Sequence, residues 1–212
     1  MVKSKRRWLL ERKKDVFFRR AKELGYESRA VFKLKYINSM FNILKNGSAV
    51  IELGCSPGGW SLYILEKIGK SGKLYAVDKV PLPIKHSYPQ IEFIQVDILQ
   101  SNFLDILSTK ISSNLVDVIL SDLAPNMTGK YELDYYRQIA LVKVVLATIE
   151  KFLKPGGSAV VKIFEGPESQ NFKKLLLSKF KFVHSIKPPA SRKHSSEFYL
   201  VGLGYSGKTL LT

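Results

Sequence analysis

The chain has 212 residues, of which 45% are hydrophobic and 25% charged, so it can build one ordinary globular core and is not a wholly disordered protein. Thirty-four Lys and Arg residues against 18 Asp and Glu residues give a formal net charge of +16. The single cysteine, Cys55, excludes a disulfide framework and a cysteine-based metal site, and it is typical of a reducing compartment. No apolar run approaches the ~18 residues that cross a membrane, so we expect no membrane partner.

The positive charge is concentrated in two segments. Residues 1–22 contain ten basic and two acidic side chains, and residues 171–194 contain seven basic and no acidic side chains. Two basic segments on a nearly neutral body are typical of a protein that binds a polyanion such as a nucleic acid. Lysine-rich faces that are merely exposed to solvent would give the same composition.

Helical spacing of apolar residues predicts two helices near the N-terminus, at 8–24 and 28–44, with Gly25 and Gly47 as the residues that end them. From Ser48 onward, short apolar strands alternate with helices. The predicted strands are 48–53, 73–77, 91–96, 115–121, 157–164, 180–186 and 197–204, and the predicted helices are about 59–69, 101–110, 133–152 and 168–178.

This alternation predicts an α/β fold with a doubly wound, mostly parallel sheet of seven strands that is covered by helices on both faces. The last two strands are joined only by the short, proline-containing segment 187–196, so they should pair in antiparallel fashion. We expect residues 1–27 to form a basic helical arm and residues 28–212 to form a single domain.

The segment 52–60, which follows the first strand, is rich in glycine and is typical of a cofactor-binding turn. Ser56 stands where the dinucleotide fingerprint requires glycine, which argues against an NAD-dependent oxidoreductase. Asp78, at the end of the second strand, could accept both hydroxyls of a ribose, and Asp97, at the end of the third, could contact an adenine amino group. The alternatives are a turn carboxylate at Asp78 and a helix cap formed by Asp97 with Gln100. A nucleoside-bearing cofactor without a pyrophosphate, such as S-adenosylmethionine, fits this pattern best.

Three charged residues fall where the predicted sheet should be apolar or should end. Lys162 interrupts a central strand, Asp122 ends the neighbouring strand, and Glu197 begins the final antiparallel strand, so all three should lie at one edge of the sheet. A structural ion pair is the alternative reading of Lys162. Lys33, in the second N-terminal helix, is by composition alone a surface or phosphate-contacting lysine. No cluster of His, Cys and Asp suggests a metal site.

Several segments together resemble the FtsJ-type ribose 2′-O-methyltransferases of RNA, over nearly the whole chain from Arg7 to about Tyr205. The segments that carry the resemblance are SRAVFKL (28–34), GCSPGGW (54–60), SDLAPNM (121–127), KPGG (154–157), VKIF (161–164), SR (191–192) and EFY (197–199). The departures are small: Cys55 and Ser56 stand where two alanines are usual, and Ala190 replaces a serine.

The resemblance implies a Rossmann-like, S-adenosylmethionine-dependent methyltransferase domain over residues 28–212. It implies a catalytic Lys-Asp-Lys-Glu tetrad that corresponds to Lys33, Asp122, Lys162 and Glu197. It further implies that S-adenosylmethionine contacts Gly58, Trp60, Asp78, Asp97 and Asp122.

For such a transfer, a ribose hydroxyl attacks the sulfonium methyl group in line, and the neutral thioether leaves without an acid or a metal. Catalysis then consists mostly of alignment and removal of the hydroxyl proton. We interpret Lys162 as the base, Asp122 as the residue that orients it, and Lys33 with Glu197 as the pair that positions the ribose. A purely positional role for Lys162 is the alternative. The two basic segments would hold RNA phosphates around the site.

Within the family, the Arg-Trp-Leu start and the segment 121–127 most resemble members that methylate a uridine of large-subunit ribosomal RNA, which makes ribosomal RNA or the large ribosomal subunit the implied partner. The alternatives are a transfer RNA ribose 2′-O-methyltransferase and a ribosome-assembly factor that binds RNA but has lost catalysis. A base N-methyltransferase is disfavoured because the segment 122–126 lacks an aromatic residue to stack on a base. We expect a monomer in the cytoplasm, or alternatively in a mitochondrion or another organelle with its own ribosomes.

Overall fold

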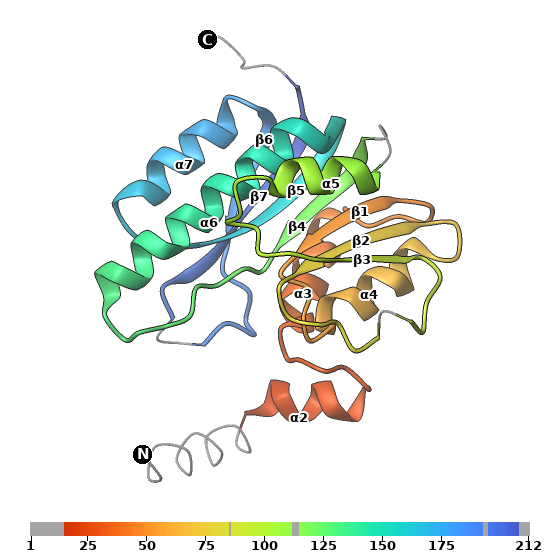
Figure 1. The fold of residues 1–212 in the computed structure, drawn as a ribbon. Helices are drawn as coiled ribbons and strands as arrows, with labels where there is room; N and C mark the ends of the chain where they lie inside the picture. Colours follow the sequence, from red (N-terminus) through yellow and green to blue (C-terminus); the bar gives the residue numbers. More distant parts are fainter. Residues whose placement is uncertain (1–14, 85, 112–114, 193–194, 208–212) are drawn as a thin grey trace.

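The computed structural model describes residues 15–84, 86–111, 115–192 and 195–207. Figure 1 shows a twisted sheet with helices on both faces and with α2 set apart beneath the sheet. In chain order the elements are α2 (Val16–Glu23), α3 (Val31–Phe41), β1 (Ala49–Leu53), α4 (Gly59–Ile68), β2 (Lys73–Asp78), β3 (Ile91–Gln95), α5 (Phe103–Ile111), β4 (Val116–Ser121), α6 (Tyr131–Phe152), β5 (Leu153–Phe164), α7 (Pro167–Leu177), β6 (Phe180–Ile186) and β7 (Glu197–Tyr205).

The seven strands form one sheet in the order β3-β2-β1-β4-β5-β7-β6. Strands β1 to β5 pair in parallel, whereas β7 is antiparallel to both β5 and β6. The predicted fold class and the predicted antiparallel pair are therefore confirmed. Among the helices that the structure describes, none is long and apolar enough to cross a membrane.

Two apolar layers fill the space between the sheet and its helices. On one face, α5, α6 and α7 pack against the sheet through residues such as Leu107, Val145 and Leu176. On the other face, α3 and α4 cover the sheet through residues such as Leu34 and Ile64, and α2 adds Ala21 to this layer. Helices α3 and α4 therefore lie over the same face of the sheet, which matters for the position of the site.

Most element boundaries differ from the sequence prediction by one or two residues, and the second helix and strand β5 differ by more. The second N-terminal helix, predicted to run to residue 44, ends at Phe41, because Asn42 takes the left-handed conformation with φ of 47°. Strand β5 begins at Leu153, four residues earlier than predicted. Of the first predicted helix, residues 8–14 lie outside the described residues, and the part that the structure describes begins after Asp15, whose side chain accepts a hydrogen bond from the backbone N–H of Phe18.

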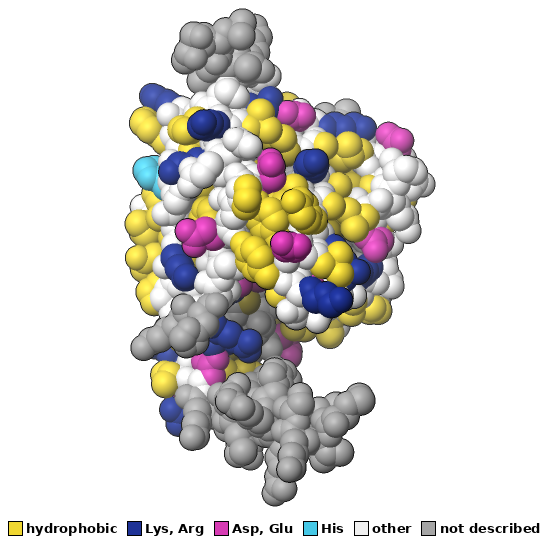
Figure 2. Space-filling view, turned by 90° about the vertical axis from the view of Figure 1, so that its left-hand side faces the viewer, with side chains coloured by type: hydrophobic (Ala, Val, Ile, Leu, Met, Phe, Trp, Pro, Cys, Tyr) yellow, Lys and Arg dark blue, Asp and Glu magenta, His cyan; other side chains and the backbone are white. Residues whose placement is uncertain are grey.

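The second basic segment is spread along the sheet rather than gathered at one edge. Because β6 runs in the same direction as β5, Lys179 and Lys181 lie at the edge where β1 to β5 begin. Among the described basic residues of this segment, Lys187 and Arg192 follow the carboxyl end of β6. Lys179 is also paired with Glu150 at 2.9 Å. Figure 2, which views the molecule from the side of α7, shows basic side chains dispersed among apolar and acidic ones. The expectation that this whole segment surrounds the site is therefore only partly met.

Glu52 is a buried carboxyl group beneath α4. It is 1% exposed, and its Oε2 accepts a hydrogen bond from Oγ of Ser61 at 2.6 Å. Burial raises the pKa of Glu52 to about 8. The Ser61 hydrogen bond opposes this shift, and the negative charges of Asp122 and Asp78 add to it. Glu52 therefore binds a proton in the folded chain at pH values where an ordinary glutamate has lost it.

This raised pKa predicts that the protein loses stability as the pH rises. The folded state keeps the Glu52 proton up to pH about 8, whereas an unfolded glutamate releases it near 4.5. Between these values the free energy of unfolding should fall with pH, with a contribution from Glu52 that approaches about 1.4 kcal/mol per pH unit. In Glu52→Gln, which stays neutral and can still accept from Ser61, this contribution should vanish. Urea unfolding measured across this pH range tests the prediction, with the exposed Glu165→Gln as the control. Parallel curves for wild type and Glu52→Gln would contradict it.

Candidate active site

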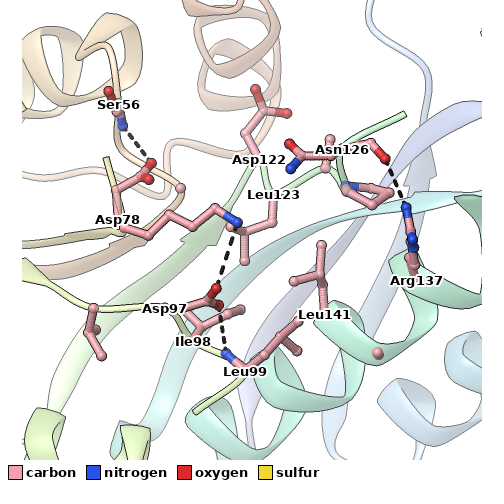
Figure 3. A pocket seen from close by; sticks show the side chains of 16 residues that line it. Ser56, Asp78, Asp97, Ile98, Leu99, Asp122, Leu123, Asn126, Arg137 and Leu141 are labelled. Atoms are coloured by element: carbon pink, nitrogen blue, oxygen red, sulfur yellow. Dashed lines mark hydrogen bonds and ion pairs between the residues drawn. The ribbon is translucent and has the colours of Figure 1, made fainter. Parts of the chain in front are cut away.

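A cavity of about 480 Å³ lies at the carboxyl ends of β1, β2, β3 and β4, the edge at which doubly wound sheets bind their ligands. We call it cavity 1. Figure 3 shows Asp78 and Asp97 on one side of it and Arg137 and Leu141, from α6, on the other. Its lining consists of Gly54, Ser56, Asp78, Lys79, residues 96–99, residues 122–126, Arg137, Ala140 and Leu141.

The turn after β1 brings backbone close to cavity 1. Gly54 has φ of 86°, and a Cβ at this position would lie 2.9 Å from Cδ2 of Leu123. Gly58, which precedes α4, has φ of 109°, a conformation that side chains disfavour. Both positions therefore require glycine. Gly54 lines cavity 1, whereas Gly58 is not among its lining residues, so the cofactor contact at Gly58 stays a prediction.

Asp78 is held in place by two backbone donors. Its Oδ2 accepts a hydrogen bond from the N–H of Ser56 at 3.0 Å, and its Oδ1 accepts one from the N–H of Val80 at 2.9 Å. A carboxylate has about four acceptor positions, so further hydrogen bonds from a ligand remain available. Asp78 therefore has both expected features. Its carboxylate accepts hydrogen bonds within the turn, and its side chain lines a cavity that could hold a ligand.

Asp97 also lines cavity 1, and the helix-capping alternative for it is wrong. Helix α5 begins at Phe103, well beyond Asp97. The Oδ1 atom of Asp97 instead accepts a hydrogen bond from the N–H of Leu99 at 3.1 Å, within a turn. Nζ of Lys79 lies 3.6 Å from the Oδ2 atom.

A second cavity, of about 570 Å³, opens beside the first, and we call it cavity 2. Its lining consists of Asp15, Phe18, residues 28–30, Lys33, Ala124, Met127, Phe164, Arg192, Ser195 and Glu197. Ala124, in the segment that follows β4, lines both cavities. The two cavities are therefore neighbours, and cavity 2 combines cationic side chains with apolar ones.

The four residues of the predicted tetrad meet where the two cavities adjoin. Nζ of Lys33 lies 2.6 Å from Oε1 of Glu197, and both side chains line cavity 2. Nζ of Lys162 donates to the backbone oxygen of Asp122 at 2.6 Å and lies 3.0 Å from its Oδ1 atom. Asp122 lines cavity 1. Lys162 is 5% exposed and Lys33 is 7% exposed, so both ammonium groups are buried next to carboxylates.

The alternation of side chains along the strands explains this meeting. Residues two apart on a strand share a face of the sheet. Lys162 therefore shares a face with Val160, and Asp122, just after β4, continues the face of Leu120; both apolar residues belong to the layer under α3 and α4. Helix α3, which covers this face, supplies Lys33.

Tyr199 joins this group, although sequence reasoning assigned it no role. Its hydroxyl donates to Oδ1 of Asp122 at 2.6 Å, and Nζ of Lys33 lies 5.7 Å from the centre of its ring. Burial, with the charges of Asp122 and Glu197, raises the pKa of Tyr199 well above its usual value, so the phenol keeps its proton and remains a donor. The spacing of two residues from Glu197 on one strand is the signal that would have identified it.

The charge of Asp122 is the result of opposing effects. Burial by itself raises the pKa of this carboxyl group, but Lys162, Lys33 and the Tyr199 hydroxyl more than offset burial, and the pKa lies below its usual value. Asp122 is therefore an anion at neutral pH, positioned between two lysines.

Trp60 contributes to the packing of the site rather than to the lining of either cavity. Its indole N–H donates to the backbone oxygen of Ala30 at 2.7 Å, its side chain is buried, and its ring lies 6.0 Å from that of Tyr199. Trp60 thereby links α4 to the start of α3 beside Lys33. A cofactor contact at Trp60 stays a prediction. Among the described residues, no group of His, Cys, Asp and Glu could hold a metal ion.

A model of the FtsJ-like methyltransferase family matches residues 26–205. The chain is 42% identical over 205 residues to the ribosomal RNA large subunit methyltransferase E of Legionella pneumophila strain Lens, which covers 97% of this chain and 98% of the relative, and the same values hold for strain Corby.

Solved structures agree with this match. A ribosomal RNA methyltransferase from Plasmodium falciparum has a TM-score of 0.75 at 30% identity, covering 86% of this chain and 100% of the other. A fibrillarin from Aeropyrum pernix, solved with bound S-adenosyl-L-methionine, shares the fold with a TM-score of 0.54 at 17% identity, covering 76% of this chain and 68% of the other. With a family match over most of its length and these relatives along nearly all of it, this protein belongs to the FtsJ-like methyltransferase family.

Proposed function

We propose that this protein transfers the methyl group of S-adenosylmethionine to a ribose 2′-hydroxyl of RNA, and that its substrate is a uridine of large-subunit ribosomal RNA. The observation that carries the proposal is the junction of cavities 1 and 2, where Asp122, Lys162, Lys33 and Glu197 converge. Two adjoining cavities with reactive side chains between them suit a reaction that joins two substrates.

The residues of cavity 1 fit a nucleoside-bearing methyl donor. Asp78, at the end of β2, presents carboxylate oxygens to ribose hydroxyls, and Asp97, at the end of β3, presents them to an adenine amino group. Ile98, Leu99 and Leu141 give this cavity apolar walls for a base. The cavity volume of about 480 Å³ lies in the range typical of small-molecule sites.

The residues of cavity 2 suit a nucleotide of an RNA strand. Arg29 and Arg192 supply positive charge for phosphates, and Phe164 and Met127 supply apolar surface for a base or sugar. The described part of the first basic segment begins at Asp15 and includes α2. Asp15 and Phe18 of this part line cavity 2. We propose that the cationic groups around cavity 2 hold the RNA strand while the ribose reaches the junction.

When bound, S-adenosylmethionine supplies an activated methyl group whose leaving thioether is neutral. The chain has two further tasks, which are to align the ribose hydroxyl and to remove its proton. Lys33 and Glu197, ion-paired at the wall of cavity 2, position the ribose. Asp122 orients Nζ of Lys162, and the Tyr199 hydroxyl donates to the same carboxylate oxygen, Oδ1. Lys162 takes the hydroxyl proton after its own ammonium has released one to solvent.

The proposed substrate is supported by the relatives. Two curated relatives at 42% identity are named ribosomal RNA large subunit methyltransferase E. The Arg-Trp-Leu start and the segment 121–127 resemble family members that act on the same RNA. We accordingly place the enzyme with bacterial-type ribosomes, in the cytoplasm or in an organelle that contains them, and we propose that it acts as a monomer.

The function is tested by locating the methyl group. Purified protein with methyl-labelled S-adenosylmethionine should label large ribosomal subunits or their RNA. Because a 2′-O-methyl group protects the neighbouring phosphodiester bond from alkali, the label should remain in an alkali-resistant fragment that contains 2′-O-methyl uridine. Transfer RNA and small-subunit RNA serve as the comparison substrates. Label on a base, or preference for transfer RNA, would contradict the proposal. Binding of S-adenosylmethionine without turnover on any of these RNAs would favour an assembly factor instead.

Asp78→Ala should weaken S-adenosylmethionine binding, because it removes a charged acceptor for the ribose hydroxyls. Such a contact is typically worth ~1.5–3 kcal/mol, which corresponds to roughly 10- to 150-fold in affinity. Isothermal titration calorimetry measures the change. Asp105→Ala removes an exposed carboxylate that lines neither cavity and should leave the affinity unchanged. Normal cofactor binding by Asp78→Ala would place the ribose elsewhere.

Lys162→Arg separates the proposed base from a structural ion pair. If Lys162 takes the proton, both Lys162→Ala and Lys162→Arg should lose ~10²–10⁴-fold in single-turnover rate, because guanidinium cannot accept a proton at neutral pH. RNA and cofactor affinities should change little.

A structural ion pair with Asp122 predicts a different pattern. Lys162→Ala would then destabilise the fold by ~3–5 kcal/mol, because Asp122 would remain as an unpaired charge, and Lys162→Arg would stay active. Melting temperatures and single-turnover rates of both variants distinguish the two roles. A stable, active Lys162→Arg enzyme would exclude Lys162 as the base.

A further inference from the structure

Arg29, at the wall of cavity 2, is fixed at both ends of its guanidinium group. Nη2 donates to the backbone oxygen of Ala190 at 2.8 Å, and Nη1 donates to Oδ2 of Asp15. These partners come from the segment before β7 and from the start of α2, so Arg29 connects three parts of the chain. The guanidinium group of Arg29, which lines cavity 2, is therefore held by partners within the chain.

Arg192 is the second arginine of this cavity. It is exposed, and it lies close enough to Arg29 to affect that side chain electrostatically: burial and then the charge of Arg192 lower the pKa of Arg29. Two guanidinium groups that repel each other are stabilised by an anion between or beside them. Guanidinium is also the side-chain group whose donors best match a phosphate, through paired hydrogen bonds.

Asp15 supplies an anion to this pair from within the chain. Its side chain has two tasks: Oδ1 accepts the hydrogen bond from Phe18 that caps α2, and Oδ2 forms the ion pair with Arg29. The ion pair is partly accessible to solvent, with side-chain exposures of 16% for Asp15 and 20% for Arg29. The capping bond uses a different oxygen from the ion pair, so the carboxylate can leave Arg29 without losing its place at the start of the helix.

From this arrangement, we infer that Arg29 and Arg192 form the binding site for one phosphate of the RNA strand, and that Asp15 occupies this site in the RNA-free protein. The inference rests on the proposed function, and it assigns a place to a phosphate near the ribose that Lys33 and Glu197 hold. Arg29 lies four residues before Lys33, in the turn that precedes α3, and the two side chains line the same cavity.

Exchange of a carboxylate for a phosphate couples RNA binding to α2. While Asp15 holds Arg29, the start of α2 is tied to the wall of cavity 2. When an RNA phosphate replaces the carboxylate on Arg29, the tie between Asp15 and the wall of cavity 2 is released, and α2 is free to move. Asp15 therefore competes with RNA for Arg29.

The experiment measures binding of a short fluorescein-labelled oligouridylate by anisotropy over a series of salt concentrations, in the full chain. Arg29→Ala and Arg192→Ala should each weaken binding about tenfold. The double variant should reduce the salt slope by about 0.7, the contribution of one phosphate on a single strand. Asp15→Asn, in which the amide oxygen still caps α2, should strengthen binding about two- to fivefold at low salt. In the Arg29→Ala background, Asp15→Asn should have no effect, because Asp15 acts through Arg29.

Lys70→Ala is the matched control, since it removes one exposed positive charge at the opposite edge of the sheet, outside both cavities. S-adenosylmethionine affinity and melting temperature report whether each variant is folded. Arg192 is exposed and in a loop, so Arg192→Ala keeps the test valid even where Arg29→Ala unfolds the protein.

Unchanged or weaker RNA binding by Asp15→Asn would contradict the inference that Asp15 competes with RNA for Arg29. A lower melting temperature with no gain in RNA affinity would show that the ion pair between Asp15 and Arg29 has only a structural role. The assignment of the phosphate site would be wrong if Arg29→Ala and Arg192→Ala bind the oligouridylate with the same affinity as Lys70→Ala. It would also be wrong if the wild-type chain does not bind the oligouridylate. These outcomes are independent of the proposed reaction. A protein that methylates a base could still pass this test, and a ribose methyltransferase could still fail it.

Discussion

A lysine in the interior of a sheet needs an anion beside it, and the partner of Lys162 is Asp122, the first residue after the neighbouring strand β4. The backbone oxygen and the carboxylate of Asp122 both contact the ammonium group, so the position of the Lys162 side chain depends on where β4 ends. Tyr199 adds a third contact to the same carboxylate. Asp122 therefore connects the end of β4 to β5 and β7 through these side chains.

The junction of the two cavities follows from this arrangement. Asp122 starts the segment whose residue Ala124 lines both cavities, so the end of β4 separates the space at the carboxyl ends of β1 to β3 from the space under the N-terminal helices. Gln138 of α6 donates to the backbone oxygen of Lys162 at 2.9 Å and to that of Leu123 at 3.3 Å, which ties this segment to β5 from the opposite face. A reaction at the junction needs alignment above all, and rigid neighbours supply it.

Near the site, each buried or partly buried cation that the structure describes is neutralised by a carboxylate partner, although the chain as a whole carries a net charge of +16. Lys33 is paired with Glu197, Lys162 with Asp122, and Arg29 with Asp15. Each pair keeps a cation at a defined place without RNA, and each carboxylate limits how strongly the free site attracts anions. Glu52, protonated up to pH about 8, adds no charge beneath these pairs at neutral pH.

Local patterns in the sequence were sufficient to predict the order of strands and helices along the chain and the antiparallel pair at its end. They also identified Lys162 as a candidate site residue, because apolar periodicity and an isolated charge are visible within a few residues. The role of Lys33 came from resemblance alone, since one lysine on a basic helix has no distinguishing local signal. Only the tertiary structure decided that the helix of Lys33 ends at Phe41 and that Trp60 packs against Ala30. It also brought Arg29 to Ala190, 161 positions apart, by long-range packing that no local pattern encodes.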